Sequence, residues 1–373
     1  MSKYAKIMWD GKNLEVPSDM GCARADQLQG TPLDNLTELA GRVCYDSLGS
    51  GRNSKDYHQH IADVGHGSVQ EHANLTFAMP TDIPNFLMCC EALLNRPGVW
   101  VSKVMPTLSV PGQAPLTLRI TANLRAIREW DKFPPMNKMA TLLGQGIQNL
   151  AKQHAPLVMQ DIVTVDDPNC PLRVVEPMFE DEMWVTVFFT NVSRGFSHEL
   201  VRHKYRTAVS QRSTRYVDEN EAPWCWHPLI LKHAEEAGEP YKNTLALLMQ
   251  CEEVCKDAYG KTVATLQQFM IDKGVDKFTA RKQARGAARG VLGNALLTEL
   301  VFSASLAEWK WIFELRASPH ADAEIRVVMD EVYEQFSQRF PDNFKNYTTV
   351  GCPDGIGYSV VDATPVDFGG QPS

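Results

Sequence analysis

The pattern of apolar and polar positions along the chain predicts a mixture of helices and strands. Residues 33–47 place Leu36, Leu39 and Val43 on one face of a helix. Residues 183–190 are rich in β-branched and aromatic side chains, which is typical of a buried strand. By the same criteria we expect strands at 72–80, 116–122 and 297–304, and helices at 83–95, 123–130, 136–154, 193–204, 241–273, 279–291 and 320–340. We therefore predict an α+β fold in which a mixed sheet is flanked by long helices.

No linker-like change of composition divides the chain, so we expect a single domain over residues 1–350. The Gly/Pro-rich residues 351–373 are predicted to form a loose tail. One weak internal similarity links Ile120–Arg125 with Phe302–Ala307, each at an expected strand-to-helix junction. A sequence preference shared by strand-to-helix junctions explains this similarity as well as an internal duplication does.

The composition is that of an ordinary globular chain with a negative net charge. The 373 residues are 44% hydrophobic and 22% charged, and the formal net charge is −8. The longest uncharged apolar run, 183–193, is shorter than the roughly 18 residues that a membrane helix needs. The first residues lack the apolar core of a signal peptide. The nine cysteines form no CxxC pair, so we expect free thiols in a reducing cytoplasm and no structural zinc.

Positive charge is concentrated in one short segment of this acidic chain. Residues 202–215 contain no acid and five basic residues, namely Arg202, Lys204, Arg206, Arg212 and Arg215. Such a stripe suits phosphate or another anion. A helix continuing to residue 204 would place Glu199 on the same face as Arg202 and His203. A solvated basic loop is the alternative interpretation, and it stays open.

Three other groups are weaker candidates for chemistry. Arg281, Arg285 and Arg289 are spaced four apart, as in an anion site or a surface salt-bridge ladder. Residues 66–72, HGSVQEH, fit a polar turn or a cofactor contact, and they lack the HExxH spacing of a metal site. We interpret Cys225, which lies between two tryptophans, as a packing residue rather than a nucleophile.

Several of these segments resemble the flavin-dependent thymidylate synthases, in the same order along the chain. Arg202-His203-Lys204, followed after eight residues by Ser213, resembles the RHR-x7–8-S signature. The stretch HGSVQEHANLTF resembles the first flavin-contacting segment of that family, and LAGRVCYDS resembles its N-terminal helix. ARKQARGAARGVL and WIFELRASPHADAEIR resemble its C-terminal segments. Residues 81–182 are extra relative to the compact members and match little in them apart from the segment of Asn123 and Arg125, which implies an insert in a flavin-dependent thymidylate synthase-like fold.

The resemblance implies a reaction. Members of this family transfer a methylene group from methylenetetrahydrofolate to C5 of dUMP, and FAD reduced by NADPH supplies the hydride that completes dTMP. The cofactor carries the difficult chemistry, and the protein orients it. The resemblance also implies a homotetramer with its sites at subunit interfaces. We expect no nucleic-acid partner, because binding to nucleic acid needs widely clustered positive charge.

Residue by residue, the resemblance implies a set of cofactor contacts and a set of substrate contacts. FAD would be contacted by His66, Ser68, Glu71, Arg202, His203, Lys204 and Arg206. The nucleotide dUMP would be bound by Glu199, Arg202, Ser213, Arg215, Arg289 and Arg316. Among these, Arg316 and Ser213 are the expected catalytic residues, and the charge of Arg316 would stabilise the enolate-like uracil.

Two departures from the family pattern bear on the cofactor and the product. Lys204 replaces the third residue of the signature and lacks the planar fork of arginine. The family's T-x-N-x-R segment is replaced by Ser303–Ala307, and the missing amide and guanidinium occur instead at Asn123 and Arg125. We hypothesise that Asn123 and Arg125 took over this flavin contact.

Other outcomes remain open at this point. FAD could be held differently, so that the methylene intermediate takes up water and gives 5-hydroxymethyl-dUMP, and the substrate could be dCMP. A catalytically silent nucleotide-binding homologue is a further alternative, which the altered residues 303–307 would suit.

Overall fold

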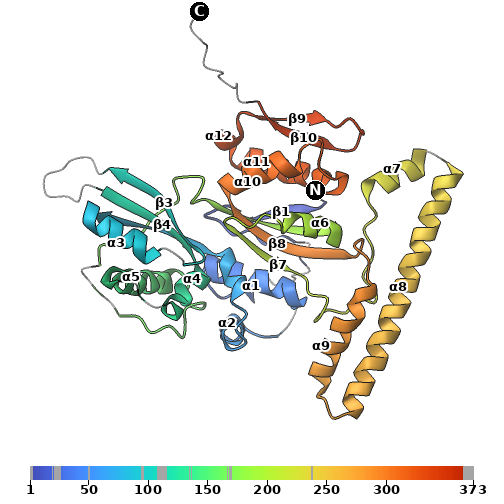
Figure 1. Ribbon diagram of the computed structural model, residues 1–373, viewed down its shortest axis with the longest axis horizontal. Helices are drawn as coiled ribbons and strands as arrows, with labels where there is room; N and C mark the ends of the chain where they lie inside the picture. Colours follow the sequence, from blue (N-terminus) through green and yellow to red (C-terminus); the bar gives the residue numbers. More distant parts are fainter. Residues whose placement is uncertain are drawn as a thin grey trace, which may run out of the picture.

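The computed structural model describes residues 3–18, 20, 27–48, 51–93, 96–106, 116–133, 135, 137–165, 167, 170–236 and 238–363. Over these residues the strands form two four-stranded sheets and one two-stranded hairpin (Figure 1). The predicted α+β class is confirmed. The sheets are antiparallel rather than mixed, because strands linked through a helix are not neighbours. The strand at 116–123 lies between those at 74–81 and 99–106, the strand at 297–305 lies between those at 184–193 and 207–211, and each pairs antiparallel with both of its neighbours.

The first sheet has the strand order β3-β4-β2-β5. Its strands are β2 (Asn74–Thr81), β3 (Val99–Pro106), β4 (Leu116–Asn123) and β5 (Arg173–Val174). Around it lie α1 (Pro32–Tyr45), α2 (Ser54–Asp63), η2 (Gly67–His72), α3 (Ile83–Leu93), α4 (Leu124–Arg128), η3 (Trp130–Lys132) and α5 (Lys138–His154). Phe77 and Ile120 of this sheet are buried in one core with Ile147 of α5. Leu36 of α1 and Phe188 of the second sheet belong to the same core, so α1 packs against both sheets.

The second sheet has the strand order β1-β6-β8-β7. Its strands are β1 (Ala5–Trp9), β6 (Trp184–Ser193), β7 (Thr207–Gln211) and β8 (Leu297–Ser305). Its other face is covered by α6 (Arg194–Leu200), α10 (Leu306–Arg316) and α11 (Ala323–Arg339), which α12 (Pro341–Phe344) and the hairpin of β9 (Tyr347–Gly351) and β10 (Tyr358–Asp362) follow. The core on this face is aromatic, and Phe302, Trp309 and Phe336 are fully buried in it. Burying each such side chain contributes about 1.5–3 kcal/mol.

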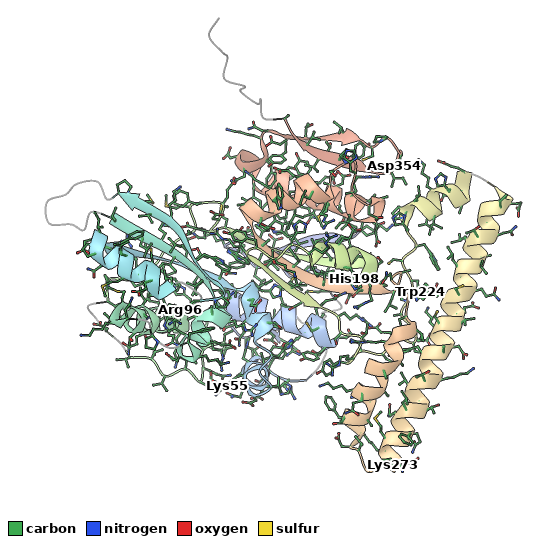
Figure 2. The ribbon with its side chains drawn as sticks, in the orientation of Figure 1. Lys55, Arg96, His198, Trp224, Lys273 and Asp354 are labelled. Atoms are coloured by element: carbon green, nitrogen blue, oxygen red, sulfur yellow. The ribbon has the colours of Figure 1, made fainter. Side chains whose placement is uncertain are left out.

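A long helical excursion separates β7 from β8. It consists of α7 (Pro228–Glu236), α8 (Glu239–Asp272), α9 (Lys277–Ala288) and η4 (Arg289–Val291). Helices α8 and α9 pack against each other and project from the body as a hairpin, with Lys273 at its far end (Figures 1 and 2). No helix in the described part of the chain is long and apolar enough to cross a membrane.

The region of the signature differs from its prediction. Helix α6 ends at Leu200, four residues before the expected end at residue 204. The chain then turns into β7, and Arg206 makes this turn with a left-handed backbone angle φ of +49°. Because Arg202 and His203 lie beyond the helix, they do not share a helical face with Glu199, and that prediction is wrong.

Three further predictions concern the C-terminal residues, the spacing of the arginines on α9 and residues 166–170. Residues 358–362, expected within a loose tail, pair with β9 as strand β10, and residues 364–373 are outside the described range. Arg289 is the C-cap of α9 and keeps helical backbone angles, and its N–H donates to the carbonyl of Arg285, so the predicted four-residue spacing of Arg281, Arg285 and Arg289 is confirmed. The sequence of residues 166–170, DDPNC, also predicts a turn, and residues 166, 168 and 169 lie outside the described range.

Candidate functional site

A cavity of about 310 Å³ lies where the two sheets meet, and residues from both surround it. The first sheet unit contributes η2, the start of β3 and the junction of β4 with α4, and the second contributes the loop between α6 and β7. Five of the residues assigned to the flavin from the sequence line this cavity together, namely Glu71, Asn123, Arg125, Lys204 and Arg206. Asn123 and Lys204 are 81 positions apart in the chain, so their meeting is a product of the fold.

Asn123 is fixed at the edge of the cavity as the N-cap of α4. Its side-chain oxygen accepts a hydrogen bond from the backbone N–H of Ala126 at 2.8 Å, which satisfies a free donor of the first helical turn. Its amide nitrogen lies beside Gly98, where a Cβ atom would clash with it. Gly98 also has a φ of +80°, so this position needs glycine for two reasons.

Arg125 is held by two carboxylates at the cavity wall. Its Nη1 donates to Oε1 of Glu71 at 2.5 Å, and its Nε lies 3.5 Å from Oε2 of Glu129. These acids raise the pKa of Arg125, so its guanidinium stays charged. About 39% of its side chain is exposed, which leaves part of the guanidinium accessible to a ligand.

The loop between α6 and β7 contributes two cationic side chains to the cavity, one buried and one exposed. Arg206 is buried, forms an ion pair with Asp181 at 2.6 Å and lies near the ring of Trp100. Its Nε is buried without a hydrogen-bond partner among the described residues. Lys204 is exposed and has no ion-pair partner in the described part of the chain. Both side chains therefore have donors to offer to an anion in the cavity.

A second group of predicted residues gathers around Arg316 at the end of α10. Its Nη1 donates to Oε2 of Glu199 at 2.9 Å, and its Nε donates to Nε2 of His203 at 3.1 Å. Nε2 of His203 must accept in this arrangement, so the ring proton sits on Nδ1, which faces Glu308 at 3.5 Å. Burial raises the pKa of Glu199, while Arg316 and the nearby Arg202 oppose that shift.

A third group lies between β7 and the end of α9. Nη1 of Arg289 donates to Oγ1 of Thr214 at 3.4 Å. The backbone N–H of Ser213 donates to the carbonyl of Cys44 at 2.9 Å, which ties this loop to α1. Arg215 and Arg289 are exposed and have no ion-pair partner among the described residues. Two exposed guanidinium groups that lack an ion-pair partner in this part of the structure, beside hydroxyl groups, are suited to a phosphate.

The predicted residues thus form three groups within this chain. Of the remaining flavin candidates, His66 receives a hydrogen bond from, or donates one to, Tyr45 across 3.1 Å, and Ser68 is half-buried in η2. Neither is among the residues that line the cavity, although Glu71 of the same segment is. No group of three or more His, Cys, Asp or Glu side chains in the described residues could hold a metal ion.

Sequence reasoning missed one buried residue that connects the two units. His72 lies within the segment 66–72, and its Nδ1 and Nε2 are 2.7 Å and 2.9 Å from the hydroxyls of Ser303 and Ser210. Complete burial lowers the pKa of His72 to about 3, so its ring is neutral. A histidine-rich segment was visible in the sequence, but nothing there indicated which ring would be buried against the second sheet.

Comparisons with known proteins agree with the motifs. Residues 181–342 match the family model described as thymidylate synthase complementing protein. The chain is 34% identical over 171 residues to the flavin-dependent thymidylate synthase of Mycolicibacterium gilvum, 32% to that of Mycolicibacterium vanbaalenii and 30% to that of Mycobacterium tuberculosis. Each of these alignments covers 46% of this chain and 64% of the relative, slightly less than two thirds of its length. The resemblance to the flavin-dependent thymidylate synthases that the motifs indicated is therefore confirmed, and the family match lies at residues 181–342.

Proposed function

We propose that this chain is a flavin-dependent enzyme that transfers the one-carbon unit of methylenetetrahydrofolate to C5 of dUMP and forms dTMP. NADPH is the proposed reductant of its FAD. One observation carries the proposal: Lys204, the third residue of the signature, and Arg206 line one cavity with Asn123 and Arg125, the pair that would replace the missing amide and guanidinium.

The residues around the cavity fit an anionic flavin nucleotide. The unpartnered Nε of Arg206 and the unpaired ammonium of Lys204 are donors without acceptors, as expected of groups that await an anion. Lys204, Arg206 and Arg125 would hold the diphosphate part of FAD, and Asn123 would hydrogen-bond to the cofactor. Bound FAD supplies the hydride in the reaction. The protein residues hold the cofactor and keep its orientation.

The nucleotide is assigned to the other two groups. Arg215 and Arg289 would bind the phosphate of dUMP, with Ser213 as a hydroxyl donor and catalytic residue. Arg316 would stabilise the negative charge that develops on the uracil carbonyl, because Glu199 and His203 already hold its guanidinium in one orientation. A homotetramer, in which a neighbouring chain brings these groups together, is part of the proposal.

Product analysis tests this function. The full chain is incubated with dUMP, methylenetetrahydrofolate, FAD and NADPH, and the nucleotides are identified by mass spectrometry, with dCMP as a parallel substrate. We expect dTMP, formed only when FAD and NADPH are both present. Formation of 5-hydroxymethyl-dUMP without consumption of NADPH would replace the proposal by a hydroxymethylase. Tight binding of dUMP and FAD without any product would indicate a catalytically silent homologue.

A further inference from the structure

The two sheet units contain the same elements in the same order. The first runs β2, α3, β3, β4, α4, α5, and the second runs β6, α6, β7, β8, α10, α11, with the α7–α9 excursion between its last two strands. The strands take the same positions in the two sheets, β3-β4-β2 and β7-β8-β6. In each sheet a further antiparallel strand, β5 or β1, pairs with the outer side of β2 or β6.

The register of the strands agrees as well. In the first sheet Thr76 pairs with Thr121, and their hydroxyls are 3.1 Å apart. In the second sheet Thr186 pairs with Ser303, and their hydroxyls are 2.6 Å apart. Both pairs lie at the third residue of the first strand of their unit. A shift of the strand pairing by one residue would move every side chain to the opposite face of the sheet. Because the hydroxyl pairs of the two sheets occupy the same position, the residues of the two units can be matched one by one.

The strand-to-helix junctions carry the same hydrogen bonds. Asn123 caps α4, and Ser305 caps α10. The backbone N–H of Asn123 donates to the carbonyl of Gly98 at 2.9 Å, and that of Ser305 donates to the carbonyl of Arg206 at 3.4 Å. Gly98 and Arg206 both have positive φ angles. The left-handed backbone conformation of Arg206 costs about 1 kcal/mol, a cost that does not arise at glycine. By this register Asn123 is equivalent to Ser305, and Arg125 to Ala307.

From this equivalence we propose that residues 73–154 and 183–339 are two copies of one module, and that a single flavin site per chain is assembled from both copies of the same chain. The nature of the ligand rests on the proposed function. The family model matches residues 181–342, which is the second copy alone.

The two copies have lost complementary parts of the site. The first copy keeps the amide and guanidinium of Asn123 and Arg125, where the second has Ser305 and Ala307. The second copy keeps the long excursion that carries Arg289, where the first joins β3 to β4 through residues 107–115 alone. Neither copy alone has the complete set of residues.

In the first copy, the residue equivalent to Lys204 of the signature does not face the cavity. Arg96, labelled in Figure 2, stands where the second copy has Lys204, but its side chain is buried against α3 and η3. It donates to the carbonyls of Ala92 and Trp130, both at 2.9 Å, and its guanidinium lies 4.0 Å from the centre of the Trp130 ring. Arg96 is used for packing, so of the two equivalent positions only Lys204 of the second copy lines the cavity.

The copies are joined within one chain by a buried polar contact. His72, at the entry to the first copy, bonds to Ser210 and Ser303 of the second, and all three are buried. The first hydrophobic core continues across the same boundary to Val301 of β8. A polar network that is fully satisfied in this way fixes how the copies face each other. The cavity at their boundary is therefore formed without a second chain.

Complementation between damaged chains tests the proposal. One chain carries Arg125→Ala and the other Lys204→Glu, each with its own tag, and the two are co-expressed and purified through both tags. FAD affinity and flavin per chain are then measured by absorbance and fluorescence titration. Each single variant should bind FAD at least about tenfold more weakly than the wild-type chain. Assembly within one chain predicts that mixed assemblies bind no better than the single variants. Wild-type FAD affinity in part of the sites would overturn assembly within one chain, because it would show that Lys204 of one chain and Arg125 of another chain form a common site.

A second measurement decides the arrangement without FAD. Helix α1 packs against β7, with Cys44 of α1 close to Ser210 of β7, so Ser210→Cys places two thiols near each other. After mild oxidation, the cross-linked species should run as a single chain on a non-reducing gel, and Ser210→Ala should show no cross-link. A cross-linked dimer would overturn assembly within one chain. If the wild-type chain binds no FAD while the cross-link stays within one chain, the proposed function fails and the assembly of the two copies stands.

Discussion

The guanidinium of Arg125 and the carboxylate of Glu71 face each other across 2.5 Å at the wall of the cavity and join α4 to η2. Replacing Arg125 by alanine removes a charged donor from the proposed flavin site. Charge-assisted hydrogen bonds contribute about 1.5–3 kcal/mol, so we expect FAD affinity to fall by roughly 10- to 150-fold. Fluorescence titration with FAD measures this change. The fold should persist, because Glu71 is partly exposed and its carboxylate can be solvated.

Arg128 of the same helix provides the matched control. It forms an ion pair with Asp161 and is not among the residues that line the cavity. Arg128→Ala should leave FAD affinity unchanged within error. Equal losses in the two variants would show that removing any arginine from α4 damages the protein, and the assignment of Arg125 to the flavin would be withdrawn.

Much of the local structure follows from the sequence, because periodicity reports neighbours along the chain. The buried strand at 183–190 and the helix at 33–47 appear as β6 and α1 within a few residues. Strand β7, TAVSQ, was not predicted, since these five residues lie inside the basic stripe 202–215 and carry no clear alternation of apolar and polar residues. The left-handed turn at Arg206, which leads the chain from the end of α6 into β7, was not predicted either, because arginine is not a residue from which such a turn is expected.

The candidate site was predictable only through recognised motifs. The similarity of Asn123 and Arg125 to the missing family segment was visible in the sequence, and the structure brings both residues to the cavity of Lys204. Periodicity alone could not place them there, because the contact spans two sheets and depends on how these pack. The identical register of the two units was hidden for the same reason, since it involves hydrogen bonds between strands that are distant in sequence.

Gly98 is expected to be intolerant of even the smallest side chain. In Gly98→Ala the new methyl group would meet the Asn123 side chain, and alanine would have to adopt a φ of +80°. We expect a loss of about 1–3 kcal/mol in the free energy of unfolding together with weaker FAD binding. Chemical denaturation and FAD titration measure the two effects. Gly65→Ala separates them, because Gly65 has a φ of +67° but open space around it. It should lose stability only, and a weaker affinity for FAD in Gly65→Ala would contradict the steric explanation.

Arg316 is expected to act mainly in the transition state. Its guanidinium is oriented by Glu199 and His203, and it would meet charge that develops only as C5 of uracil reacts. Loss of such a preorganised donor costs about 10²–10³ in kcat, so Arg316→Ala should lower kcat by this factor with a smaller change in the KM for dUMP. Lys310→Ala on the same helix removes an ion pair with Glu180 and should leave kcat unchanged. A rise in KM at constant kcat would instead place Arg316 in ground-state binding.

Stability should fall as the pH drops below neutrality, and His72 should be one cause. Burial lowers the pKa of this ring to about 3 in the folded chain, against about 6.5 when the chain is unfolded. Above pH 6.5 neither state binds the proton, so His72 has no effect there. Between pH 6.5 and 3 only the unfolded chain is protonated, so unfolding becomes easier by about 1.4 kcal/mol for each pH unit. At pH 5 this amounts to about 2 kcal/mol. His58, whose pKa burial lowers to about 4, adds a similar dependence.

Urea denaturation at pH 7 and at pH 5 isolates the contribution of His72. His72→Gln removes the titrating ring and should reduce the difference between the two unfolding free energies by about 2 kcal/mol, whatever its effect at pH 7. His198→Gln is the control, because His198 is exposed on α6 and its removal should leave the difference unchanged (Figure 2). The comparison uses differences within each variant, so a general loss of stability does not affect it. Equal pH dependence in the wild-type chain and in His72→Gln would mean that the ring is accessible to protons in the folded chain, and the buried contact between the two sheet units would have to be abandoned.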